Sequence, residues 1–189
     1  MNKVAAIIPC LNGAKYLRQC LDSVMAQDYA GPMEVVVADD GSTDVSPAIA
    51  SEYAPRVRWL PCPRDAVHGC GAARNRAIQA TTAKYVALLD ADDIWFPGHI
   101  TALVDVMDAH QEIAFACDNG RYIDQADHVY GSIVSEGRDT ELNPTSMLLD
   151  CFTDQLPSLS GGPLWRQSGA LHRRPDFYTW RTTIYGSSS

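Results

Sequence analysis

Four short aliphatic runs, each followed by a helical pattern, constrain the fold of this chain most strongly. The runs lie at residues 4–9, 33–38, 57–60 and 84–89. A short apolar run is typical of a strand that is covered on both faces. Between the runs, apolar residues recur at helical spacing, as Leu17, Leu21 and Val24 do within 14–27. Strands that alternate with helices through short links predict a parallel α/β sheet with right-handed crossovers.

The pattern changes after residue 112. Up to that point, helices are expected at 14–27, from 44 to about 53, at 71–80 and around 100–107. Beyond it, 113–117 and 128–134 are predicted to be strands, and the sequence from Glu136 is irregular and rich in Gly, Pro and Ser. We therefore divide the chain into a first half, 1–112, and a second half, 113–189, of one domain.

Composition excludes some classes of protein. The 189 residues carry a net charge of −8, which argues against a nucleic-acid partner. No apolar run approaches the ~18 residues of a membrane span, and we interpret the N-terminus as a strand, not as a signal peptide. The six cysteines lack zinc-ribbon spacing, so reduced thiols and a cytoplasmic location are expected. A peripheral membrane role and the oligomeric state stay open.

Carboxylates gather directly after two of the expected strands. Asp39 and Asp40 follow one, and the segment LLDADD places Asp90, Asp92 and Asp93 after another. The carboxyl ends of parallel strands meet at one edge of a sheet, where ligands bind, so the two groups can lie close together. Like charges this near are costly unless a cation neutralises them. Since Mg²⁺ and Mn²⁺ prefer oxygen ligands, the cluster predicts a divalent cation held for a phosphate-bearing ligand.

Each of these carboxylates also has a structural alternative. An Asp of the LLDADD segment could cap the helix that follows. Asp39 or Asp40 could serve only the turn that Gly41 permits. The segment HGCGAARN contains GxGxx before a helix, but it lacks the third glycine and a preceding strand, so a dinucleotide site is weakly supported. Arg74 and Asn75 in this helix could reach a base or a phosphate, or be solvated.

Four segments in order resemble the family 2 glycosyltransferases over about residues 4–110: IIPCLNGAKYLRQCLDSVMAQDY, EVVVADDGSTD, HGCGAARNRAI and AKYVALLDADDIW. FACDNGRYIDQADHVYGS is similar to the segment that follows them. The resemblance implies the GT-A fold, a Rossmann-like, mostly parallel α/β sheet flanked by helices. It also implies a nucleotide-sugar donor, most often a UDP-sugar, a DxD motif that binds Mn²⁺ or Mg²⁺, and inversion at the anomeric carbon. Residues 1–112 would then be the donor half and 113–189 the acceptor half.

The resemblance also implies roles for individual residues. Its donor-binding residues are Pro9, Leu11, Asn12, Asp39, Asp40, Arg74, Asn75, Asp90, Ala91 and Asp92. The first three would line the base and ribose, and Asp40 would contact uracil. Asp92 would hold the metal most directly, Asp90 would contact the ribose or the waters of the metal, and Asp93 could share the metal role.

The catalytic base is the point at which the sequence departs from the family. An acceptor hydroxyl needs a general base, which in the family is a carboxylate in a Glu-Asp pair ahead of an aromatic residue and a Trp. No such pair occurs after residue 112, and the nearest match is Asp176 in PDFYTW. Asp176 is therefore the candidate base, the alternative being an exposed loop residue. We interpret the C-terminal part as divergent or truncated.

Three functions remain to be weighed. The leading one is a metal-dependent glycosyltransferase of polysaccharide biosynthesis that acts on a glycan, a lipid-linked acceptor or another hydroxyl. The second is a nucleotide-sugar-binding domain that lacks turnover. The third is a phosphatase or phosphotransferase with Asp90 and Asp92 as nucleophile and acid. The third is disfavoured because Asp93-Ile94 follows where Gly-Thr is usual, and because no lysine occurs after Lys84.

Overall fold

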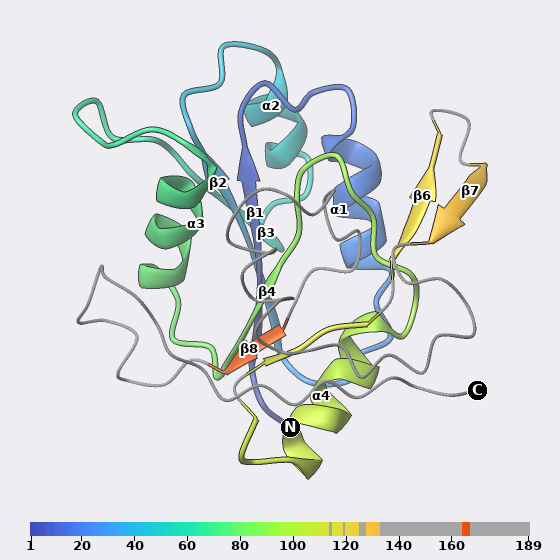
Figure 1. Cartoon of the computed structure of the whole chain (residues 1–189). Helices are drawn as coiled ribbons and strands as arrows, with labels where there is room; N and C mark the ends of the chain where they lie inside the picture. Colours follow the sequence, from blue (N-terminus) through green and yellow to red (C-terminus); the bar gives the residue numbers. More distant parts are fainter. Residues whose placement is uncertain (114, 119, 125–127, 133–163, 167–189) are drawn as a thin grey trace.

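The chain folds into a mixed β-sheet flanked by helices (Figure 1). The structure is a computed structural model, and it describes residues 1–113, 115–118, 120–124, 128–132 and 164–166. The strands of the main sheet, in spatial order, are β3 (Val57–Leu60), β2 (Met33–Asp39), β1 (Val4–Cys10), β4 (Tyr85–Leu88), β8 (Leu164–Arg166) and β5 (Phe115–Ala116). The helices are α1 (Leu17–Met25), α2 (Ser46–Ser51), α3 (Cys70–Gln79) and α4 (His99–Ala109). A separate antiparallel pair consists of β6 (Arg121–Ile123) and β7 (Val129–Ser132).

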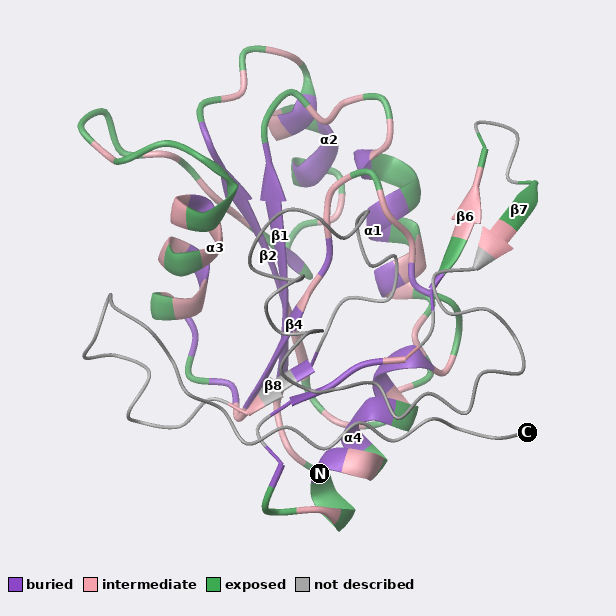
Figure 2. Ribbon diagram, in the orientation of Figure 1, coloured by how far each residue is buried: buried purple, intermediate pink, exposed green. Residues whose placement is uncertain are grey.

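The four strands predicted from the aliphatic runs form the parallel part of the sheet. β1 pairs in parallel with β2 and β4, and β2 pairs in parallel with β3. All residues of β1 are buried, as expected for a strand covered on both faces (Figure 2). Because Cys10 lies opposite Asp39 in the register, β1 and β2 end at the same edge. The fold class predicted from the sequence is therefore confirmed.

Helices cover both faces of the sheet. On one face, Ala6 and Ile8 of β1 belong to a core that includes buried residues of α1, α2 and α4. On the other face, Ala5 and Ile7 pack with Ala73 and Ala77 of α3. The successive residues of β1 thus alternate between two cores, as the pleat of a strand requires. None of the helices in the described part is long and apolar enough to span a membrane.

The boundaries and the antiparallel strands differ from the predictions. α1 begins at Leu17 rather than at residue 14, because Tyr16 N–H and Leu17 N–H both donate to the Gly13 carbonyl in a preceding turn. The predicted strand 113–117 shortens to β5, and β7 begins one residue later than the predicted strand 128–134. β8 was predicted to be irregular, but it lies antiparallel between β4 and β5. The short strand β6 was not predicted.

Candidate functional site

A cavity of about 400 Å³ opens at the carboxyl ends of β1, β2 and β4. It is lined by Pro9, Cys10, Leu11, Asn12, Gly13, Tyr16, Asp40, Gly69, Cys70, Asp90, Ala91 and Asp92. The cavity therefore brings together the carboxylates that follow two different strands, fifty residues apart in the sequence. This is the edge of a parallel sheet at which ligands are expected to bind.

Asp40 forms one wall, and its carboxylate is fixed by the start of α3. The residue is 7% exposed. Its Oδ2 accepts a hydrogen bond from Gly69 N–H at 2.7 Å, and its Oδ1 lies 3.4 Å from Arg76 Nη2. Gly69 has φ +113° and ψ 154°, a backbone conformation that is almost confined to glycine. The glycine before α3 thus aims a backbone donor at Asp40.

Asp39 closes a turn and does not line the cavity. Its Oδ1 accepts a hydrogen bond from Ser42 N–H at 2.8 Å, which is the structural alternative considered above. Asn12 does line the cavity, but its Oδ1 accepts from Thr43 N–H at 2.8 Å, and its own N–H donates to Ser42 Oγ at 3.0 Å. Asn12 therefore ties the loop after β1 to the loop after β2.

The acidic loop after β4 forms the opposite wall. Asp90 forms an ion pair with the guanidinium of Arg74, so this predicted donor-binding residue of α3 does reach the acidic loop. The exposed carboxylate of Asp92 accepts no hydrogen bond from the described part of the chain. Asp93 N–H donates to the Asp90 carbonyl at 3.0 Å. Burial, and then the charges of Asp90 and Asp92, raise the pKa of Asp93 to about 7.

The acidic loop fits a hard divalent cation. Its carboxylate oxygens are the ligands that Mg²⁺ and Mn²⁺ prefer. Burial is the main cause of the raised pKa of Asp93, and the charges of Asp90 and Asp92, which add to it, are charges that a cation would offset. Within the described residues, Asp90, Asp92 and Asp93 do not form a preassembled group of three ligand atoms. An ion in this loop would complete its coordination with water and with the phosphates of a ligand.

Some predicted residues lie apart from the cavity, and others were missed. Asn75 is exposed on α3 and does not line the cavity. Asp176 lies outside the described residues. Arg76 was missed, although it donates to the Asp39 carbonyl at 2.8 Å and lies beside Asp40. Arg76 lies three residues after Ala73 and next to Ala77, the two buried residues of α3, and this spacing in the sequence indicates that its side chain lies near the buried face of the helix.

The chain matches the family model described as glycosyl transferase family 2 over residues 5–169. An uncharacterized glycosyltransferase of Escherichia coli, YibD, is 42% identical over 99 residues, which are 51% of this chain and 28% of that protein.

Two solved structures are similar in fold. TarS 1–349 of S. aureus in complex with UDP-GlcNAc has a TM-score of 0.59 and 26% identity, over 71% of this chain and 38% of that one. The mannosyltransferase PcManGT of Pyrobaculum calidifontis in complex with GDP-Man and Mn²⁺ has a TM-score of 0.54 and 26% identity, over 67% and 37%. The chain thus spans well under half the length of these proteins.

Proposed function

Because the chain belongs to glycosyl transferase family 2, we propose that it transfers a sugar from a nucleotide-sugar donor to a hydroxyl acceptor. The observation that carries the proposal is the cavity with the buried Asp40 on one wall and Asp90 to Asp92 on the other. One wall suits a nucleobase that donates an N–H, and the other suits a cation with a diphosphate. The donor is a UDP-sugar, and the sugar is inverted at its anomeric carbon.

The proposed base-binding wall depends on Asp40. A buried carboxylate that already accepts from Gly69 N–H keeps further lone pairs, and uracil N3–H can donate to one of them. Pro9 and Leu11 supply apolar surface at the end of β1, and Leu11 is 57% exposed, so that it is accessible to a planar base. The structure of TarS in complex with UDP-GlcNAc supports a UDP-sugar as the donor.

The proposed phosphate-binding wall is the acidic loop. Asp92 and Asp93 would hold Mn²⁺ or Mg²⁺, and Asp90 would remain paired with Arg74 beside it. The bound cation would neutralise charge that develops on the leaving diphosphate. The Arg74 guanidinium orients Asp90 and brings a positive charge to the same wall. The structure of PcManGT in complex with GDP-Man and Mn²⁺ supports a divalent cation as the cofactor.

The proposed base for the acceptor hydroxyl is Asp176, which rests on the resemblance of PDFYTW alone and lies outside the described residues. The acceptor is a glycan or a lipid-linked hydroxyl, as in polysaccharide biosynthesis, and the location is cytoplasmic. The alternative is a domain that binds the donor without turnover. It is favoured by the absence of a Glu-Asp pair after residue 112.

Calorimetric titration of UDP tests the donor site. UDP is titrated in Mn²⁺ and in EDTA, into wild type, Asp92→Ala and the control Asp105→Ala, which removes an exposed carboxylate of α4 outside the cavity. We expect Mn²⁺-dependent binding that Asp92→Ala weakens at least ~10-fold, corresponding to about 1.4 kcal/mol, and that Asp105→Ala leaves unchanged. Absence of binding to wild type in both buffers would overturn the UDP-sugar assignment.

Asp176→Asn separates the enzyme from the binding domain. If Asp176 is the base, the variant keeps the affinity for UDP and loses sugar transfer, which product analysis with a panel of glycan and lipid acceptors measures. Equal transfer by wild type and variant would remove Asp176 from this role. Tight UDP binding by wild type without transfer to any acceptor would favour the donor-binding domain.

A further inference from the structure

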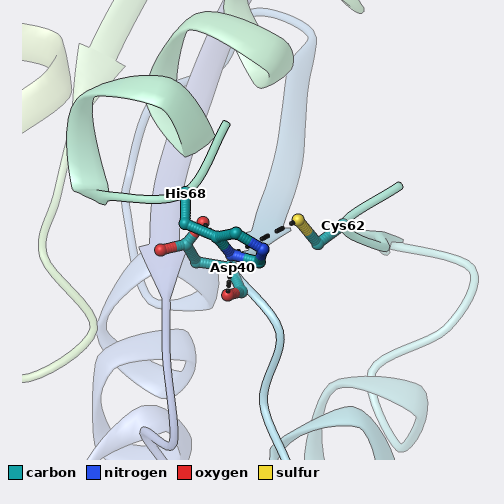
Figure 3. Close-up of side chains that lie close together, drawn as sticks. All are labelled: Asp40, Cys62 and His68. Carbon is teal, nitrogen blue, oxygen red and sulfur yellow. Dashed lines mark hydrogen bonds and ion pairs between the residues drawn. The ribbon is translucent and has the colours of Figure 1, made fainter. Parts of the chain in front are cut away.

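A second group of potential metal ligands lies next to Asp40 (Figure 3). Cys62 follows β3 by two residues, and His68 comes two residues before α3. The ligand atoms of Asp40, Cys62 and His68 all lie within 4.8 Å of one another, which no other group of three metal-ligating side chains in the described part of the chain achieves. Figure 3 shows the His68 ring close to both the Cys62 sulfur and Asp40.

The distances are close to those of one tetrahedral ion. Cys62 Sγ lies 3.9 Å from His68 Nδ1, which lies 3.5 Å from Asp40 Oδ1. Zinc bonds of about 2.0–2.3 Å at tetrahedral angles require ligand atoms roughly 3.3–3.6 Å apart. These two separations need to change by a few tenths of an ångström at most, and all three ligand atoms already lie within 4.8 Å of one another, so rotation of the His68 and Cys62 side chains would complete the site. His68 Nδ1 would exchange its contact of 3.0 Å with the Asp40 carbonyl for the ion.

The surroundings support such an ion. Gly69 N–H holds Asp40 Oδ2, which leaves Oδ1 turned toward His68, and orients the ligand as outer partners do in metal sites. The side chain of His68 is 61% exposed, so an ion can enter from solvent. A thiolate and a carboxylate supply two negative charges that match those of a divalent ion, and the positive charge of Arg76, 3.4 Å from Asp40 Oδ1, works against them.

This ligand set favours a different ion from the one that the acidic loop favours. Thiolate and imidazole suit Zn²⁺, whereas oxygen-only ligands suit Mn²⁺ and Mg²⁺. We propose that Asp40, Cys62 and His68 bind Zn²⁺ with a fourth position open to water, and that this Zn²⁺ excludes the nucleobase of the donor. The exclusion follows because Asp40 belongs to both sites, and this second part rests on the proposed function. Zn²⁺ is then an inhibitor that acts from the base-binding wall.

Cobalt spectroscopy tests the site without any donor. Co²⁺ is titrated into the reduced, apo full chain, and absorption by thiolate-to-cobalt charge transfer is expected to rise to one equivalent and to vanish when Zn²⁺ is added. Cys62→Ala and His68→Ala should each weaken Zn²⁺ binding at least ~100-fold, since even outer partners of a metal contribute about 10–100-fold. The control His128→Ala removes an exposed imidazole that belongs neither to the cavity nor to this group of ligands, and it should bind as wild type does. Charge transfer that persists in Cys62→Ala would overturn the proposal.

Competition with UDP tests the inhibition. In excess Mn²⁺, one equivalent of Zn²⁺ should raise the apparent Kd of UDP at least ~10-fold for wild type and leave it unchanged for Cys62→Ala. Zn²⁺ that binds but does not alter the Kd would overturn the exclusion of the base. If wild type binds Zn²⁺ at these residues but never binds UDP, the proposed function fails and the Zn²⁺ site stands. Circular dichroism establishes that both variants are folded.

Discussion

Asp93 is part-buried near two other carboxylates, and its ionisation is therefore costly. Its pKa is raised to about 7, so the folded state is favoured in acid and loses this advantage as the pH rises through 7. We predict that Asp93→Asn leaves the free energy of unfolding in EDTA nearly unchanged near pH 4 and increases it by about 2 kcal/mol at pH 8. This figure is roughly half of the free energy that corresponds to a rise in pKa from 3.8 to about 7, because the partly exposed side chain keeps some hydration. Urea titrations at both pH values measure the change, and an equal gain at both would contradict it.

Arg76 satisfies three acceptors around Asp40 and is the residue whose loss should damage this wall most. It donates to the carbonyls of Val67 and Asp39 and lies beside the Asp40 carboxylate. Arg76→Ala should lower the free energy of unfolding by about 2 kcal/mol, because a buried carboxylate loses its charged partner. Arg18→Ala is the matched control, since it breaks an exposed pair with Glu52 and should cost clearly less stability than Arg76→Ala does. Equal losses in urea unfolding would contradict the role of Arg76.

At the scale of elements, two glycines lie at the start of α3, but only Gly69 has a backbone conformation that requires glycine. Gly69 has φ +113°, whereas Gly71 lies within α3 without a positive φ, and a Cβ would meet no atom within 4 Å at either position. Gly69→Ala should therefore destabilise the protein by about 1–3 kcal/mol through backbone strain alone, and weaken UDP binding by displacing the N–H that holds Asp40. Gly71→Ala should stabilise α3 by about 0.5–1 kcal/mol. Thermal unfolding measures both, and the same sign for both would contradict the assignment.

The sequence was informative about elements whose pattern is local. β1 to β4 were predicted because a strand that is buried on both faces is a continuous apolar run. α4 was predicted because a helix that is buried on one face has apolar residues at helical spacing. β8 has three residues, too few for any period, and it is defined by pairing with β4 and β5. Such an antiparallel insertion depends on partners that are distant in the sequence.

The site was predictable to the same extent. Asp40, Asp90 and Asp92 line one cavity, in line with the prediction that the carboxylates after the two strands lie close together at one edge of the sheet, while their roles toward a donor and a metal stay predictions. The donor from Gly69 was not predicted, since a backbone N–H has no residue type that signals its direction. Arg76, which was not singled out from the sequence, lies beside Asp40, whereas Asn75, which was predicted to reach a base or a phosphate, is exposed.

For the molecule as a whole, the two walls imply that a nucleotide and a cation bind cooperatively. One wall holds the base and the other holds the cation with its phosphates, so each ligand should raise the affinity for the other by the same factor. UDP with Mn²⁺ should therefore stabilise the folded chain by more than the sum of the two ligands alone. At ~100 times its dissociation constant, a ligand contributes about 2.7 kcal/mol.

Thermal shift measures this coupling. For a domain of this size, about 1 kcal/mol corresponds to roughly 2–4 °C, so UDP with Mn²⁺ should raise the Tm by about 5–10 °C. EDTA should abolish most of this shift, and Asp92→Ala should show the smaller shift of wild type in EDTA because it lacks the carboxylate that holds the cation. A shift by UDP that is equal in Mn²⁺ and EDTA would mean that the acidic loop does not bind a cation together with the nucleotide, and that its carboxylates serve the turn after β4 alone.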